Sequence, residues 1–163
     1  MGEDLLRRLI EHHEWANRGL LRFCESLDAA VLDREPTIGD WTIRKVLEHL
    51  VECERGYLSI LTVPPGDRRE PRFAVGALEE QARSSGQELL ALVVSEAFPW
   101  GRHVRSTDGY VIEPWVVLLQ ALNHGADHRR QVAMLLRAQG IDPPRVDGWS
   151  YGEAQGALLP PSG

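Results

Sequence analysis

The sequence has few of the features that distinguish disulfide-rich, secreted or membrane proteins from ordinary globular proteins. It holds only two cysteines among 163 residues, so a disulfide framework is excluded and a cytoplasmic location is expected. No apolar run approaches the roughly 18 residues needed to cross a bilayer. The first residues, MGEDLLRRLIEHHEW, mix charged and apolar side chains, unlike a signal or transit peptide. We therefore expect no association with a membrane.

Basic charge is also scarce. There are 18 lysines and arginines against 24 acidic residues, giving a net charge of −6, which argues against nucleic acid as a partner. Lys45 is the only lysine, a bias typical of a GC-rich bacterial genome, and we give it no functional weight. The sequence also lacks a Gly-rich phosphate loop and the Ser/His/Asp order of a hydrolase elbow.

The composition is that of an ordinary globular protein, with 43% apolar and 26% charged residues. A chain of this length most simply forms one domain, here residues 1–163, around a single core. It contains no internal repeat. The tail, from about residue 141 to 163, is rich in proline and glycine, and Trp149 and Tyr151 are expected to anchor it to the rest of the domain.

Apolar residues recur every three or four positions in four segments, the pattern of amphipathic helices. The first segment spans about residues 3–27, with a stripe formed by Leu6, Leu9, His13, Ala16, Leu20, Phe23 and Leu27. The second begins near Asp40 or Thr42, either of which is a suitable N-cap. Its apolar stripe is formed by Ile43, Val46, Leu50, Cys53, Tyr57 and Ile60. The helix is expected to end before Pro64, Pro65 and Gly66.

The third and fourth helices are expected over about residues 75–95 and 114–140. Ser85 and Gly86 weaken the expected continuity of the third helix. Gly140 is a natural stop for the fourth. Between these helices, Asp108-Gly109 is a two-residue hairpin signal, and either a short ribbon or an irregular loop fits it. The sequence predicts an all-α four-helix bundle, with a polar connection through DRREPR after the second helix.

Three histidines point to a metal site. His124 and His128 are four residues apart, so they lie on one face of a helix with Cβ atoms about 5–6 Å apart. His49 borders the apolar stripe of the second helix. A single histidine on a helix is more simply a hydrogen-bonded side chain, but three imidazoles bordering apolar stripes would each need a buried partner. Three ligands with an open position are typical of a catalytic metal.

Four other residues are candidates for the pocket or for outer contacts to the ligands. Glu52 and Asp127 could orient an imidazole, although a solvated surface position is the simpler interpretation of both. Cys53 could be a fourth ligand, a reactive thiol or an inert buried cysteine. His13 could line the pocket or be a core histidine. His103, near the hairpin signal, is expected to face solvent.

The motifs HHEWANRGLL, DWTIRKVLEHLVECE, NHGADHRRQVAMLL and DGWSYGEA resemble, in order and spacing, the DinB-like (DinB/YfiT) four-helix-bundle superfamily. The third is similar to its H-x-x-x-H-R-x-Q signature, with Arg129 and Gln131 in place. The resemblance implies a divalent metal, zinc, nickel or iron, on His49, His124 and His128. It also implies a bundle with a long crossover between the second and third helices, and a homodimer. The implied function is a transferase that activates a low-molecular-weight thiol, of the bacillithiol or mycothiol type, for attack on an electrophile.

Two other functions stay open at this point. The same ion could activate water for hydrolysis, although Gly125 stands where the H-E-x-x-H peptidases have their glutamate, which disfavours peptidase chemistry. Alternatively, the chain could be a non-enzymatic module that binds a metal or ligand in a stress response.

Overall fold

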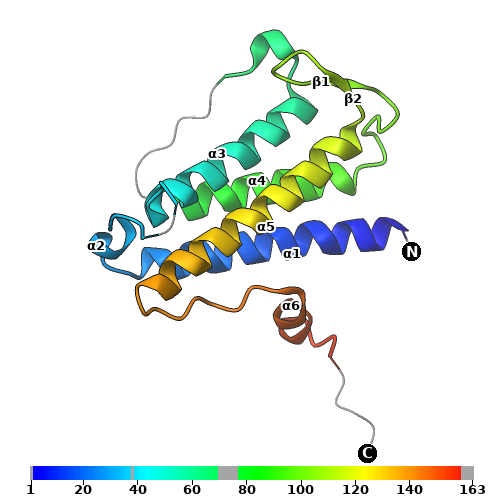
Figure 1. The fold of residues 1–163 in the computed structure, drawn as a ribbon. Helices are drawn as coiled ribbons and strands as arrows, with labels where there is room; N and C mark the ends of the chain where they lie inside the picture. The colour runs from blue at the N-terminus through cyan, green and yellow to red at the C-terminus, as the bar shows by residue number, and fades with distance from the viewer. Residues whose placement is uncertain (1, 38, 70–76, 159–163) are drawn as a thin grey trace, which may run out of the picture.

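The computed structural model describes residues 2–37, 39–69 and 77–158, and four long helices dominate it (Figure 1). These helices are α1 (Gly2–Glu25), α3 (Ile43–Thr62), α4 (Leu78–Val93) and α5 (Pro114–Ala138). They form a ring in which α1 and α3 each contact both α4 and α5. The predicted all-α four-helix bundle is confirmed.

Short helical elements accompany the long helices. They are α2 (Ala29–Leu32), the 3₁₀ turn η1 (Pro65–Asp67) and α6 (Gly148–Ala154), none of which we predicted. The crossover from α3 to α4 starts at Val63 and reaches α4 after Ala77. Part of its predicted sequence, residues 70–72, and the predicted start of the third helix at residue 75 lie outside the described residues.

The hairpin between α4 and α5 forms, but not with a two-residue turn. Strands β1 (Val104–Arg105) and β2 (Val111–Ile112) pair in antiparallel register, so residues 106–110 make the loop. Ser106 closes this loop, because its backbone N–H donates to Tyr110 O at 2.8 Å and its Oγ accepts from Tyr110 N at 2.9 Å. Gly109 has a φ of +91°, a conformation that favours glycine. The ribbon lies where α3 ends and α5 begins (Figure 1).

The buried face of α3 differs from the predicted stripe. Cys53, Tyr57 and Ile60 are only half-buried, whereas the buried residues are Ile43, Val46, Leu47, Leu50, Val51, Glu54, Leu58 and Leu61. The reason is that α3 packs against two neighbours, α4 and α5, and so buries a broader arc than one stripe. The stripe predicted for α1 is also partly wrong, because Leu9 is 44% exposed and Ile10 is buried in its place.

Ser85 and Gly86 do not interrupt α4. Both are buried where α4 packs against α1, and the Ser85 hydroxyl donates to Gln81 O at 2.8 Å within the helix. A side chain at Gly86 would meet the Cβ of Glu14 at 2.9 Å. Glycine is therefore used here for close helix approach rather than as a helix breaker.

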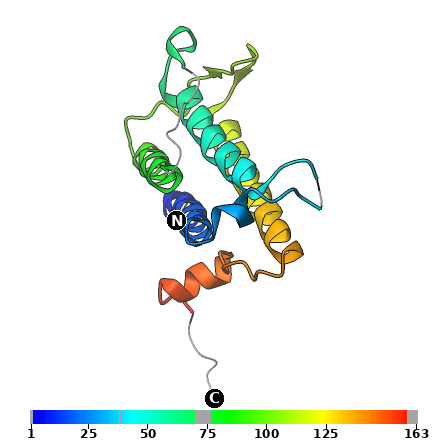
Figure 2. The same ribbon diagram turned by 90° about the vertical axis from the view of Figure 1, so that its left-hand side faces the viewer.

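Within the tail, α6 packs beneath α1, as the two views show (Figure 1 and Figure 2). Tyr151 anchors it as predicted: its ring lies 5.4 Å from the rings of His12 and Trp15, and its hydroxyl donates to Glu11 at 3.2 Å. The prediction for Trp149 is wrong, because this side chain is 73% exposed. Two residues in a helix are about 200° apart around the axis, so α6 cannot turn both aromatic rings toward α1.

The core is divided into two apolar clusters, one at each end of the bundle. One contains Leu21, Leu47 and Leu136, and the other contains Ile10, Leu58 and Leu118. Between them lies a set of polar side chains, His13, Asn17, Glu54 and Arg129, which we call the polar layer. Within the described chain, no helix has the length and apolar character of a membrane span.

Candidate metal centre

The structure brings the three predicted ligands together. His49 comes from α3, and His124 and His128 lie one turn apart on α5, so that one ring nitrogen from each falls within 4.8 Å of the others. The Nε2 atoms of His124 and His128 are 3.1 Å apart. Two nitrogens bound to one zinc at 2.0–2.1 Å lie about 3.3 Å apart in a tetrahedral site. The spacing of this pair therefore suits a shared ion.

Electrostatics keep these imidazoles able to bind a metal. Burial is the largest cause that lowers the pKa of His124 to about 4, and the neighbouring His128 and His49 lower it further. The pKa of His49 is also lowered, first by burial and then by His128. At neutral pH both rings are therefore uncharged, and an uncharged imidazole offers a lone pair to a metal.

Gln131 fixes the tautomer of His128. Its amide oxygen Oε1 lies 3.0 Å from His128 Nδ1, and an amide oxygen can only accept a hydrogen bond. Nδ1 must then carry the proton, which leaves the Nε2 lone pair directed at His124. Such an outer contact is the usual way a protein orients a ligating imidazole, and it gives a physical role to the glutamine of the sequence signature.

Two aromatic rings, which the sequence did not suggest as site residues, surround the histidines. Trp41 meets the His49 ring edge-on at 4.8 Å and lies parallel to the His128 ring at 6.4 Å. Tyr57 meets the His124 ring edge-on at 5.6 Å. Together they restrict the rotation of all three imidazoles. In the sequence, the only indication that Trp41 belongs to the site was its position directly before the N-cap Thr42.

One side of the histidine cluster opens into a cavity of about 460 Å³ lined by His49, Glu52, Cys53, Gly56, Tyr57, Ile60 and Thr107. Cys53 Sγ is 3.5 Å from His49 Nε2, but burial raises the pKa of this thiol, and the ligand cluster does not include it. The cavity therefore contains a neutral thiol beside His49 and the carboxyl group of Glu52.

Asp127 does not contact the histidine rings. Its side chain is 70% exposed and pairs with Arg130 at 3.4 Å, which matches the surface role weighed for it. His103 is also exposed, as expected. His13 is buried, 2% exposed, and belongs to the polar layer rather than to the ligand cluster.

The polar layer is a continuous chain of hydrogen bonds across three helices. His13 Nε2 and Asn17 Nδ2, both on α1, donate to Glu54 Oε2 on α3 at 2.8 and 2.7 Å. Arg129 Nη1 on α5 donates to Asn17 Oδ1 at 2.6 Å. Burial lowers the pKa of Arg129 to about 10 while the nearby Glu54 opposes the shift, so the guanidinium stays charged at neutral pH.

This layer borders the histidine cluster. A small void is lined by His13, Glu54, Tyr57, His124 and Gly125. Two buried atoms in it, His13 Nδ1 and Glu54 Oε1, have no hydrogen-bond partner in the described structure. Sequence reasoning missed Glu54 and chose Glu52, although Glu54 falls on the line of Leu47, Val51, Leu58 and Leu61. An acidic residue at a buried position of the helix was the feature of the sequence that could have indicated this role.

A helical bundle with three inward histidines on two facing helices defines a class of protein that could hold a divalent ion at an open site. The DinB family model matches residues 1–161, and the chain belongs to the DinB family. No curated protein matches the chain. The predicted family is confirmed, and His49, His124 and His128 lie close enough together that they could hold a metal ion.

Proposed function

We propose that this protein is a metal-dependent transferase that activates a low-molecular-weight thiol for attack on an electrophile. His49, His124 and His128 would hold a zinc, nickel or iron ion, all of which accept imidazole ligands. A bound divalent ion lowers the pKa of a coordinated thiol, so that it reacts as the thiolate. The observation that supports this function best is the cavity of about 460 Å³ on the open side of the histidines.

The chain's own residues make an external nucleophile necessary in this proposal. Cys53 is the thiol nearest to the cluster, and its raised pKa keeps it protonated. Glu52 lines the same cavity as His49 and would accept the proton that the incoming thiol loses. The sulfur then forms a bond to the electrophilic carbon, and the leaving group departs with the electrons of the bond that breaks.

The test compares metal-free protein, prepared with a chelator, with protein reloaded with zinc, nickel or iron. Each sample receives an aryl halide as electrophile, with and without bacillithiol, mycothiol or cysteine. We expect conjugation that needs both metal and thiol. Turnover without added thiol would instead identify a hydrolase, and tight metal binding with no turnover under any condition would identify a non-enzymatic binding module.

Two histidine variants separate the centre from general effects of histidine loss. His49→Ala removes the α3 ligand and should abolish both stoichiometric metal binding and conjugation. His103→Ala removes an exposed histidine outside the cluster and should leave both unchanged. Glu52→Gln should retain the metal and slow conjugation, because only the proton acceptor is lost. Full conjugation by His49→Ala would refute the assignment.

We also propose that the protein is a homodimer. Apolar side chains lie exposed along the start of α5 and the adjoining hairpin: Tyr110, Val111, Trp115, Val116 and Leu119. Exposed apolar patches of this kind mark interaction surfaces. Light scattering should give twice the chain mass, and Leu119→Glu should reduce it to the monomer. A wild-type monomer at high concentration would contradict the proposal.

A cytoplasmic location is also inferred. Cys24 and Cys53 are both free thiols, as expected in a reducing compartment. Fractionation of the source cells tests this directly.

A further inference from the structure

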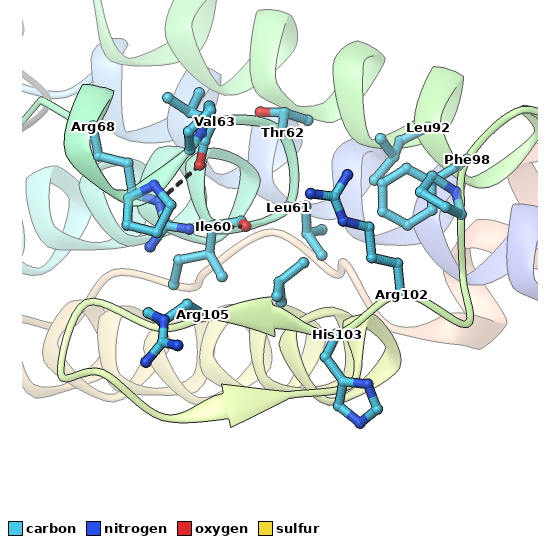
Figure 3. Close-up of a pocket in the computed structure, with 14 residues that line it drawn as sticks. Ile60, Leu61, Thr62, Val63, Arg68, Leu92, Phe98, Arg102, His103 and Arg105 are labelled. Atoms are coloured by element: carbon cyan, nitrogen blue, oxygen red, sulfur yellow. Dashed lines mark hydrogen bonds between the residues drawn. The ribbon is translucent and has the colours of Figure 1, made fainter.

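A second cavity lies where α3 ends and the hairpin begins, and the histidine centre does not use it. Its volume is about 540 Å³, within the range of small-molecule sites. Ile60 and Leu61 of α3, Leu92 of α4 and Phe98 of the following loop give it an apolar floor (Figure 3). The ring of Trp100 supports Phe98 from the side, with their centroids 4.6 Å apart.

The described lining of this cavity is basic and contains no carboxylate. It includes Arg68, Arg102, His103 and Arg105, in a chain whose net charge is −6. Elsewhere in the described structure, arginines such as Arg18 and Arg44 are paired with acidic side chains. A cavity that gathers cations without their counter-ions is suited to an anion.

Arg68 has a structural role that accounts for its position. Its Nε donates to Val63 O at 3.0 Å, and its Nη2 donates to Ile60 O at 3.2 Å. These carbonyls belong to the C-terminal end of α3, where the last carbonyl groups lack helical partners. Arg68 therefore caps α3 with two of its donors, while its Nη1 is buried without a hydrogen-bond partner among the described residues.

Arg102 has no such role. Within the described part of the chain its guanidinium has no hydrogen bond or ion pair, and Figure 3 shows it extending over the cavity between Leu61 and Phe98. Arg105 Nη1 donates to Gly109 O at 3.2 Å, and among the described residues its other donors have no partner. An arginine fork matches a carboxylate in geometry, and one free guanidinium suits a singly charged group.

We propose that this cavity binds an amphipathic organic carboxylate, with its apolar part against Ile60, Leu61 and Phe98 and its carboxylate on Arg102. The site is distinct from the histidine centre. Of the described lining residues, the two cavities share only Ile60. Ile60 is eleven residues after His49, about 16 Å along the helix. Binding therefore does not depend on the metal.

The test is calorimetric titration of the full-length, metal-free protein with sodium octanoate, beside octanol and octylamine, which carry the same chain on a neutral or cationic head. We expect saturable binding of one octanoate per chain, and binding at least tenfold weaker for both controls, since a hydrogen bond to a charged group contributes about that factor. Equal affinity for octanol, or no saturable octanoate binding, would overturn the proposal.

Variants locate the site. Arg102→Met keeps an unbranched stem and removes the charge, so octanoate affinity should fall roughly tenfold without a change in thermal unfolding. Arg137→Met changes an exposed arginine on α5 away from the cavity and should bind as the wild type does. Thr62→Trp fills the cavity from an exposed position and should block binding. Unchanged binding by Arg102→Met or Thr62→Trp would place octanoate elsewhere and refute the site. His49→Ala, which changes only the histidine centre, should bind octanoate as the wild type does.

Discussion

Replacing Gly125 with alanine should destabilise the bundle, because the His13 ring occupies the space that a side chain would fill. A Cβ at Gly125 would overlap His13 Cε1 and lie 3.1 Å from both His13 Nδ1 and Arg129 Nη1. The ring would have to withdraw until its nearest carbon contact reached about 3.5 Å. It is held in place by its 2.8 Å hydrogen bond to Glu54, so the withdrawal strains or breaks that bond.

The expected change in the free energy of unfolding is the sum of three contributions. Overpacking costs about 1–3 kcal/mol, and leaving a buried hydrogen-bonding group unsatisfied costs about 1–3 kcal/mol more. Alanine gains about 1 kcal/mol over glycine inside a helix. We therefore expect Gly125→Ala to lower the free energy of unfolding by about 1–5 kcal/mol. In a chain of this size, each kcal/mol lost lowers the melting temperature by about 2–4 °C. The loss should therefore be measurable as a lower melting temperature.

Gly56→Ala is the matched control. Gly56 is also inside a long helix, but a Cβ there meets no atom within 4 Å, so only the helix propensity changes. This variant should gain up to about 1 kcal/mol, and the difference between the two variants isolates the clash. Urea unfolding followed by circular dichroism, with a chelator present so that metal binding does not contribute, measures both. If Gly125→Ala were as stable as Gly56→Ala, the described position of the His13 ring would be wrong.

Three further predictions use other parts of the structure. Gln131→Leu removes the acceptor that holds the His128 tautomer and should weaken zinc binding about 10–100-fold in a competition titration, while unaltered affinity would dismiss this role. The pKa of His124 is lowered from 6.5 to about 4, so the unfolded state binds more protons between these values. The stability of metal-free protein should fall as the pH drops from about 6.5 toward 4, and His124→Gln should flatten that dependence in pH-dependent urea unfolding. Gly86→Ala should push α4 away from Glu14 and lose up to about 2 kcal/mol net, with partial recovery in Glu14→Ala/Gly86→Ala. Stabilisation by the single change would contradict the close approach.

The parts of the fold that depend on local periodicity could be predicted from the sequence. Four long helices follow from the recurrence of apolar residues, and the ends of α3 and α5 follow from Thr42 and Gly140. The histidine cluster was also accessible, because a four-residue spacing fixes His124 and His128 on one face and His49 borders the face of α3 that meets α5. Each of these inferences needs only helical geometry.

The rest depends on packing between helices that are distant in sequence. Glu54 resembles any acidic residue of an amphipathic helix until α1 supplies His13 and Asn17 beside it. The exposure of Trp149 depends on the rotation of α6, which is set by Tyr151. The short helices α2 and α6 did carry a local signal, since Asp28 and Asp147 accept hydrogen bonds from backbone groups in their first turns. That signal marks a helix start and says nothing about length.

The division of the histidines between α3 and α5 has a consequence for the order of folding. His49 and His124 are 75 positions apart in the chain, and α4 and the hairpin lie between them. A fragment that ends before α5 would contain one ligand, and an isolated α5 would contain two, so neither reproduces the cluster. The loop between the two halves must close before the third nitrogen arrives, so binding of an ion by all three histidines can only follow assembly of the bundle. An ion bound at this centre would therefore report that the chain has already folded.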